Sequence, residues 1–261
     1  MTDLHIHILP GVDDGSPNLS TSLEMAEIAA KSGVCILAVT PHANQTGIEG
    51  VEDGYVNYDS EQLLELFYRL EQEIRKEHIP ISLVRGMEIM SIGPLNEKIK
   101  ERKLIPLHES RYYLIEVPFD MAPDGIRRLL MEFPAMGKIP VLAHPERYFC
   151  VQDYPSLIYH WLQLGCFTQL NKGSILGKFG RHAQIAADYL LRYRLATCIA
   201  SDAHSPVMRT THMRDIIEYL LETYGEREMF RLLFENPDRM ICDRDIPHHG
   251  SLPERRRGLF F

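Results

Sequence analysis

The chain has 261 residues, 45% of them hydrophobic and 25% charged, and its formal net charge is −8. This composition is ordinary for a globular protein. The negative charge disfavours a general nucleic-acid-binding protein, because nucleic acid is bound through basic surfaces. A membrane-spanning helix is disfavoured as well, since no apolar run reaches the length of about 18 residues that such a helix needs.

The five cysteines, at positions 35, 150, 166, 198 and 242, are scattered and form no Cys-x-x-Cys pair. An unpaired, odd set in a chain that starts almost directly with a strand, without room for a targeting segment, favours the reducing cytoplasm. No cysteine is followed by an arginine six positions later, so the nucleophile and phosphate-binding arginine of the cysteine-dependent phosphatases are missing. Cys35, Cys166 and Cys198 lie in strand-like runs, where we expect buried small hydrophobic residues rather than catalytic groups.

Strands and helices alternate along the chain. The first strand is predicted over residues 2–8 and is followed by a helix over 20–32, capped by Ser20 or Ser22. The second strand, 35–40, is almost wholly apolar, as expected of a parallel strand that is buried on both faces. A polar, glycine-rich connection over 43–58 is interpreted as a cover over the site, and a helix is predicted over 60–78.

The alternation continues through five further strands, predicted over residues 81–87, 112–117, 140–143, 167–171 and 196–201. Helices are predicted over 94–102, 123–136, 155–164, 178–193, 207–223 and 226–235. Seven strands that alternate with helices imply parallel pairing and right-handed crossovers. A closed or partly closed barrel would let residues that are distant in sequence converge. We expect one domain over 1–242 and a flexible tail over 243–261.

Candidate metal ligands gather where the predicted strands end. His5 and His7 point the same way along the first strand, because side chains alternate between its faces. Later strands also finish on His, Asp or Glu, at the end where barrel enzymes carry their sites. The candidates are His5, His7, Asp14, His42, Glu88, Glu116, His144, Asp202 and His204.

This set is too large for one ion, so we predict two or three divalent ions bridged by a carboxylate. Imidazoles and carboxylates without a thiolate suit Mn, Fe or Zn better than Ca. Arg147, three residues after His144, and Arg209, five residues after His204, are interpreted as phosphate-binding residues, with a surface ion pair as the alternative for each. Asn171 is expected to donate a hydrogen bond to a ligand. The other histidines outside the tail are interpreted as structural or exposed, namely His78, His108, His160, His182 and His212.

The sequence resembles the polymerase-and-histidinol-phosphatase (PHP) family. More narrowly, it resembles the bacterial metal-dependent protein-tyrosine phosphatases that act on the tyrosine kinases of capsule and exopolysaccharide synthesis. The matching stretches, in family order, are DLHIHILPGVDDG at 3–15, TPH at 40–42, GMEI at 86–89, LIEVPF at 114–119, AHPERY at 143–148 and ASDAH at 200–204. Ala43-Asn44 departs from many relatives, which have a further histidine after TPH, but this leaves His42 unaffected.

The resemblance implies a distorted seven-stranded (β/α)7 barrel of the TIM-like PHP type, which holds two or three ions, most often manganese. It implies the same ligands one by one, and Arg147 as the substrate-binding arginine, while Arg209 lies in a less regular stretch. The implied activity is hydrolysis of phosphotyrosine on a bacterial tyrosine autokinase. A metal-bound hydroxide would attack phosphorus while Arg147 stabilises the phosphate.

Two other functions stay open at this point: a small-molecule phosphatase of the same family, such as histidinol-phosphate phosphatase, and a non-catalytic, metal-stabilised regulatory module. The tail carries Arg255-Arg256-Arg257 followed by Leu259-Phe260-Phe261. This pattern predicts either a disordered end or a weak contact with an anionic membrane surface or with the kinase.

Overall fold

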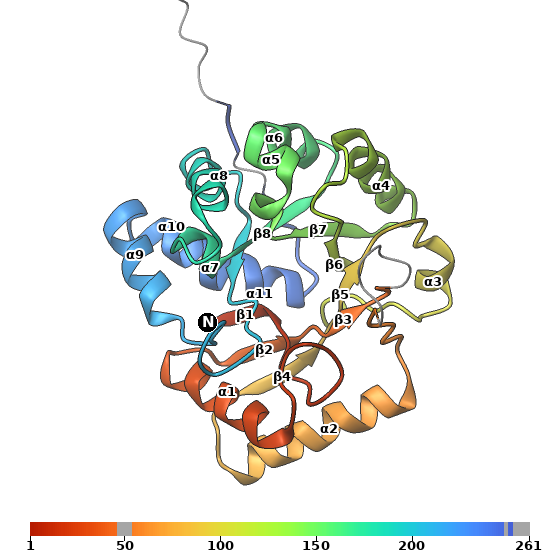
Figure 1. The fold of residues 1–261 in the computed structure, drawn as a ribbon, viewed down its shortest axis with the longest axis vertical. Helices are drawn as coiled ribbons and strands as arrows, with labels where there is room; N and C mark the ends of the chain where they lie inside the picture. Colours follow the sequence, from red (N-terminus) through yellow and green to blue (C-terminus); the bar gives the residue numbers. More distant parts are fainter. Residues whose placement is uncertain (46–53, 248–249, 253–261) are drawn as a thin grey trace, which may run out of the picture.

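The computed structural model describes residues 1–45, 54–247 and 250–252. Its strands lie at the centre of the molecule and its helices surround them (Figure 1). The described strands form two sheets, one with the order β1-β2-β4 and the other with the order β3-β5-β6-β7-β8-β9. Every pair within these sheets is parallel, as the alternation of strands and helices predicted. The strands are β1 (Thr2–Ile6), β2 (Ile36–Val39), β3 (His42–Ala43), β4 (Ser82–Arg85), β5 (Glu88–Met90), β6 (Tyr112–Glu116), β7 (Ile139–Ala143), β8 (Phe167–Asn171) and β9 (Cys198–Ala200).

The two sheets together follow the order of a barrel. Only Thr40 and Pro41 separate β2 from β3, and only Gly86 and Met87 separate β4 from β5, so these strands correspond to seven passes of the chain. Proline has no N–H to donate to a ladder, which accounts for the break at Pro41. Between β9 and β1 the pairing is a single bridge from Ile6 to Ala203. The predicted α/β barrel is confirmed, although its hydrogen bonding is not continuous around the ring.

The helices pack their apolar faces against the strands. In α2, for example, Phe67, Leu70 and Ile74 are buried at the spacing of one helical face. The longer helices are α1 (Leu19–Lys31), α2 (Glu61–Lys76), α4 (Pro123–Ala135), α8 (Arg181–Arg192) and α9 (Arg214–Tyr224). The shorter ones are α3 (Asn96–Lys100), α5 (Phe149–Asp153), α6 (Leu157–Leu162), α7 (Lys172–Ile175), α10 (Glu226–Phe230) and α11 (Asn236–Ile241). A 3₁₀ turn covers Pro145–Arg147, and a π-helical turn covers Arg231–Glu235.

Three helix predictions were wrong in detail. The cap of α1 is Asn18, whose side chain accepts a hydrogen bond from the Thr21 N–H at 3.0 Å. Ser22 is buried instead and donates to the Ile8 carbonyl. The helix expected over 155–164 spans only α6, and α5, which precedes it, was not predicted. The helix expected from residue 207 begins only at Arg214. The chain before Arg214 is a loop beside the site, as shown below.

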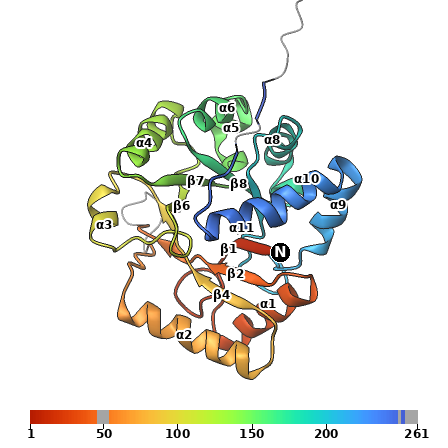
Figure 2. The ribbon, with the colours of Figure 1, turned by 180° about the vertical axis from the view of Figure 1, so that it is seen from behind.

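An apolar cluster closes one end of the barrel, so a substrate can reach the strands only from the other end. Met240 and Ile241 of α11 belong to this cluster, together with Leu4 of β1 and Leu114 of β6. Figure 2 shows α11 crossing the strands at this end. Water is therefore excluded from the amino-terminal ends of the strands, and the carboxyl ends stay accessible.

Some expectations concern residues that the structure does not describe. Residues 46–53 of the predicted cover and Arg255 to Phe261 of the tail lie outside the described ranges. Within the described ranges, none of the helices combines the length and the apolar character needed to cross a bilayer.

Candidate metal centre

The predicted ligands come together at the carboxyl ends of the strands, on elements that are far apart in sequence. Their positions are His5 in β1, His7 and Asp14 in the segment after β1, His42 in β3, Glu88 in β5, Glu116 in β6, His144 directly after β7, and Asp202 and His204 after β9. Two backbone hydrogen bonds align the first and last strands: His7 N–H donates to the Ala203 carbonyl and Asp202 N–H to the His5 carbonyl, both at 2.9 Å. In the same way, the register of β3 and β5 places His42 beside Glu88.

Two of these residues have an uncommon backbone conformation. His144 has a φ of 33° and Asp202 a φ of 50°, both in the left-handed region that side chains other than glycine rarely adopt. Each follows a strand by one or two residues, where the chain turns into the site. Such strain is typical of functional positions, because the surrounding structure must hold it in place.

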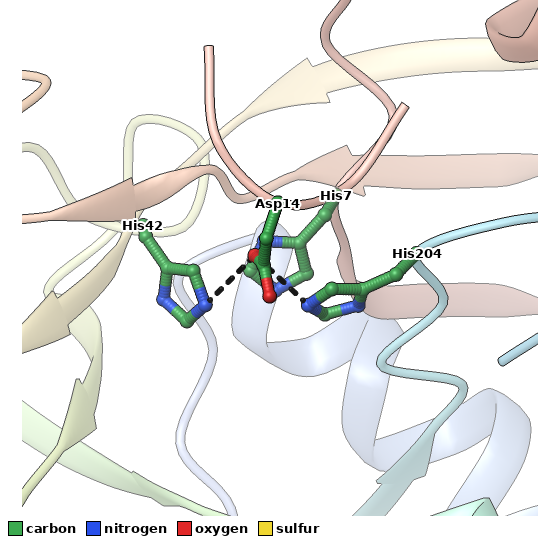
Figure 3. Close-up of side chains that lie close together, drawn as sticks. All are labelled: His7, Asp14, His42 and His204. Atoms are coloured by element: carbon green, nitrogen blue, oxygen red, sulfur yellow. Dashed lines mark ion pairs between the residues drawn. The ribbon is translucent and has the colours of Figure 1, made fainter. Parts of the chain in front are cut away.

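A first group of ligands consists of His7, Asp14, His42 and His204 (Figure 3). Asp14 Oδ1 lies between two imidazoles, 3.4 Å from His42 Nε2 and 3.3 Å from His204 Nε2. The ring of His7 packs behind this carboxylate, with its centroid 3.9 Å from that of His204. Asp14 is the most accessible ligand, with its side chain 50% exposed.

Two further groups adjoin the first one. One consists of His5, His7 and Asp202, in which His5 Nε2 lies 3.1 Å from His7 Nε2 and 3.4 Å from Asp202 Oδ1. The other consists of His42, Glu88 and Glu116. In each group, one ligand atom per residue lies within 4.8 Å of the others. Because His7 and His42 are each shared between groups, the three positions are contiguous, as expected for bridged ions.

His144 lies outside these three groups but contacts the same carboxylates. Its Nε2 atom lies 2.9 Å from Glu88 Oε1 and 3.6 Å from Glu116 Oε1. Burial lowers the pKa of His144 to about 4, even though the contact with Glu88 opposes this shift. The imidazole is therefore neutral at pH 7, which is the state in which histidine binds metals.

Glu116 lacks sufficient positive charge around it. Burial and the negative charge of Glu88 raise the pKa of Glu116 to about 8, so this carboxyl holds a proton at pH 7 unless a cation arrives. Glu88 and Asp202 are also buried, and burial raises their pKa. His5 and the other surrounding imidazoles, together with Arg209 beside Asp202, outweigh this effect and hold both pKa values well below the ordinary range. Buried acidic groups that share too few cations are the setting that a divalent ion stabilises.

Unused lone pairs give a second test of whether metal ions fit. Several buried ligand atoms make no hydrogen bond, which is costly for a polar atom away from water. These atoms are His42 Nδ1, Glu88 Oε2, Glu116 Oε2, His144 Nδ1, Asp202 Oδ1 and His204 Nε2. Nitrogen and oxygen donors within bridging distance of one another therefore fit divalent metal ions of the Mn, Fe or Zn type.

Sequence reasoning missed two residues that orient the ligands. Asp13 Oδ2 accepts from His7 Nδ1 at 2.8 Å, and Gln169 Oε1 lies 2.8 Å from His5 Nδ1. Both contacts occupy Nδ1 and leave Nε2 of each histidine for a metal. Asp13 is adjacent to the predicted ligand Asp14, and this position could have indicated an orienting role. Gln169 gives no such signal, because only the register of β8 brings it to the site. Asn171, which was expected to contact a ligand, does so by donating from its side chain to Asp202.

The two predicted arginines lie at the mouth of the site. Arg147 Nη1 is 3.7 Å from Asp202 Oδ2, and Arg209 forms an ion pair with the same oxygen. Arg209 Nε also donates to the Asp202 carbonyl at 3.1 Å. The loop that carries Arg209 is closed at its base, because the N–H groups of His204 and Ser205 both donate to the Arg209 carbonyl. This closure explains why no helix begins at residue 207.

A cavity of about 370 Å³ connects the ligands with the arginines. Its lining includes the ligands Glu88, Glu116 and His144 as well as Arg147 and Arg209. Phe119, Pro118, Val117 and Met90 add an apolar wall. A larger cavity of about 950 Å³ lies against β4 and contains none of the ligands. We assign the site to the smaller cavity, because the candidate ligands line it and do not line the larger one.

The remaining titratable residues agree with their predicted structural roles, except that Cys35, which was expected to be buried, is exposed. Cys166 and Cys198 are buried, and burial raises the pKa of both thiols, so neither is a reactive thiolate. Cys35 and Cys242 are exposed and unpaired, and Cys150 is half-buried. All five histidines that were interpreted as structural or exposed are exposed, namely His78, His108, His160, His182 and His212.

Comparison with known proteins agrees with this geometry. The tyrosine-protein phosphatase YwqE of Bacillus subtilis is 34% identical over 260 residues, covering 100% of this chain and 99% of the relative. The tyrosine-protein phosphatase CpsB of Streptococcus pneumoniae is 26% identical over 251 residues, covering 94% of this chain and 100% of the relative.

Solved structures give the same result. A crystal structure from a study of YwqE and CpsB, described as unique metal-dependent tyrosine phosphatases, superposes with a TM-score of 0.87 at 33% identity, covering 98% of this chain and 100% of that one. A D-hydantoinase from Thermus sp. superposes with a TM-score of 0.51 at 9% identity, covering 92% of this chain and 70% of the other, and shares the fold alone. Residues 1–242 match the family described as capsular polysaccharide synthesis, CpsB/CapC, and the chain belongs to this family.

Proposed function

We propose that this protein is a metal-dependent tyrosine-protein phosphatase. The observation that carries the proposal is the convergence of a buried, mixed His/Asp/Glu ligand set and two arginines on one cavity. The similarity to YwqE and CpsB supports the same activity. We further propose that residues 1–242 act as a single catalytic domain.

Divalent ions held by the nine ligands would neutralise the phosphate and lower the pKa of a coordinated water to about 7. The chain contributes the rest. Arg147 and Arg209 line the same cavity as the ligands and are placed to donate to the free phosphate oxygens. Gln169 and Asp13 hold the imidazoles of His5 and His7 in the tautomer that leaves Nε2 free. The apolar wall with Phe119 suits an aromatic leaving group.

The leaving group explains why a strong acid is not needed. The phenol of tyrosine has a pKa of about 10, so tyrosinate leaves more easily than the alkoxide of serine. Among the described residues, no cysteine side chain lines the cavity, so a phosphocysteine intermediate has no candidate nucleophile there. The reaction that fits is direct hydrolysis, with the arginines holding the charge that grows on the phosphate.

We propose manganese as the preferred metal, with two or three ions per chain and iron or zinc as substitutes. The proposed substrate is a phosphotyrosine-containing bacterial tyrosine kinase that controls capsule or exopolysaccharide synthesis, in line with the family to which the chain belongs. We place the reaction in the cytoplasm, where the free cysteines seen here stay reduced.

A small-molecule phosphatase of the same fold is the competing function. Purified protein treated with a chelator should lose phosphatase activity, and Mn²⁺ should restore it, whereas thiol alkylation should leave it unchanged. Activity on a phosphotyrosyl peptide should then exceed activity on histidinol phosphate. Full activity in the metal-free protein would contradict the metal-dependent mechanism, and a preference for histidinol phosphate would favour the competing function. A protein that binds metal but hydrolyses neither substrate would be a regulatory module.

A further inference from the structure

Both arginines at the site contact the same aromatic ring. The guanidinium carbon of Arg147 lies 4.7 Å from the centroid of Phe179, and that of Arg209 lies 5.6 Å from it. Phe179 belongs to the segment between α7 and α8, which holds none of the predicted ligands. The face of a phenyl ring attracts cations because of its quadrupole, so a single ring can hold two guanidinium groups near each other.

A second ring also contacts Arg147. Phe119 lies in the segment after β6, and the centroid of its ring is 4.6 Å from the guanidinium carbon of Arg147. With phenyl groups in contact with it from two segments, the guanidinium directs its N–H groups outward along its own plane. One of these groups already faces Asp202. The contacts with Phe119, Phe179 and Asp202 therefore restrict the guanidinium of Arg147 before any phosphate enters.

The backbone around Phe179 is shaped to receive its ring. Gly177 and Gly180 both have positive φ values, 76° and 87°, and they flank the two residues at the turn. The Lys178 N–H donates to the Gly173 carbonyl at 2.7 Å, which folds the segment back over α7. A Cβ atom at Gly173 would lie 2.4 Å from Cε2 of Phe179, so only glycine leaves space for the ring there. Three glycines therefore serve the placement of one phenylalanine.

We propose that Phe179 is a positioning residue that aligns Arg147 and Arg209 toward the phosphate. The proposal rests on the proposed function, in which these arginines bind the phosphate. A long arginine side chain that is already held loses less conformational freedom when the substrate arrives, and this favours the aligned geometry in the transition state. Phe179 does not line the cavity and acts only through the two arginines.

The test replaces the aromatic ring with an aliphatic side chain of similar size. Phe179→Leu should lower kcat/KM for a phosphotyrosyl peptide roughly tenfold, within the range of a partly buried cation–π contact. The inhibition constant of inorganic phosphate should rise in parallel. Phe179→Tyr keeps the ring face and should stay within twofold of the wild type. Phe230→Leu, on the exposed surface of α10, is the matched control and should change neither value. Metal content and thermal unfolding are measured for each variant, and Phe179→Met replaces the leucine variant if that one fails to fold.

A double-mutant cycle separates positioning from a general structural effect. In an Arg147→Ala background, the fold-loss in kcat/KM caused by Phe179→Leu should be at least threefold smaller than in the wild type. One of the two guanidinium groups that contact the ring is then absent. An undiminished loss in that background, or a loss below threefold in the single variant, would overturn the positioning role. If Arg147→Ala itself has wild-type activity, the proposal that Arg147 binds the phosphate is contradicted. If Arg147→Ala is impaired while Phe179→Leu is not, only the positioning role fails.

Discussion

His7 Nδ1 donates to Asp13 Oδ2 across 2.8 Å, and this contact decides which nitrogen of His7 faces the ligand cluster. Asp13 also accepts from the His42 N–H at 3.0 Å and from the Gly15 N–H at 3.0 Å. One carboxylate thus orients two neighbouring ligands and the turn that carries Asp14. Outer carboxylates of this kind fix the tautomer of a histidine and raise its basicity.

We therefore predict that Asp13→Asn weakens metal binding about tenfold to a hundredfold, because the amide is uncharged and can also present its NH₂ group to the imidazole. The measurement is Mn²⁺ affinity by competition with a chelator of known affinity. Asp124→Asn, at an exposed position in α4, is the control. An unchanged affinity in Asp13→Asn would mean that the backbone alone orients His7.

Arg147 gives the second prediction. Arg147→Ala should keep its metals and its fold but lose about 10²–10³ in kcat/KM on a phosphotyrosyl peptide, the usual cost of removing a donor that acts in the transition state. Arg147→Lys should recover only part of the activity, because an ammonium cannot make the planar, bidentate contact. His144→Ala should lose metal as well as activity, since His144 contacts two ligand carboxylates.

Arg192→Ala provides the matched arginine control, because this residue is exposed on α8 and pairs only with Asp188 within its own helix. It should retain wild-type turnover. Near-normal turnover in Arg147→Ala with full metal content would leave Arg147 with nothing more than its ion pair to Asp202.

The sequence indicated which candidate ligands would come together because most of them lie at or just after a strand end, and strand ends are set by local patterns of apolar residues. His42 and His144, for example, follow runs that are almost wholly apolar. The orienting residues could not be predicted in this way. Gln169 lies inside β8 and reaches His5 only because of how the strands are placed around the barrel. Phe179 depends similarly on the turn made by Gly177 and Gly180, which no periodicity reveals.

Helix limits were less predictable for a comparable reason. Residues 207–213 have no strong turn signal in their sequence, but the backbone of His204 bonds to that of Arg209 and keeps this stretch from continuing as a helix. Asn18 caps α1 in place of the predicted Ser22, because the hydroxyl of Ser22 donates to the buried carbonyl of Ile8. Tertiary contacts of this type decide between equally suitable capping residues.

The C-terminal tail gives a third prediction, which rests on the sequence alone. Arg255-Arg256-Arg257 beside Leu259-Phe260-Phe261 joins positive charge to apolar side chains. Each basic residue near an anionic bilayer contributes about 1 kcal/mol, so the tail should give weak, salt-sensitive membrane binding. Flotation with anionic and with neutral liposomes should show more full-length protein than a 1–250 truncation on the anionic ones only. Equal partitioning of the two forms would exclude this role.

The fourth prediction concerns an ion pair that holds the last helices to the barrel. Glu228 of α10 accepts from Arg194 at 2.9 Å and from Arg231 at 3.2 Å. Arg231 in turn donates to the Ala196 carbonyl at 3.0 Å, just before β9. Burial raises the pKa of Glu228, but the two arginines outweigh it and hold that pKa below its ordinary range. Glu228 is therefore charged in the folded protein at pH values where an unfolded chain would already be protonated.

A carboxyl group whose pKa is lowered by folding stabilises the protein above its unfolded pKa of about 4.3, and this contribution is lost as the pH falls through the folded value. Glu228→Gln should therefore lower the free energy of unfolding by about 1–3 kcal/mol at pH 7, because Arg231 is left buried beside an uncharged amide. The difference from the wild type should narrow below about pH 4. Urea unfolding of both proteins in excess chelator, at pH 7 and again in acid, measures this without interference from bound metal. Glu226→Gln, exposed on the same helix, is the control. A difference that stays constant from pH 7 into acid would show that Glu228 stabilises the fold through its shape rather than through its charge.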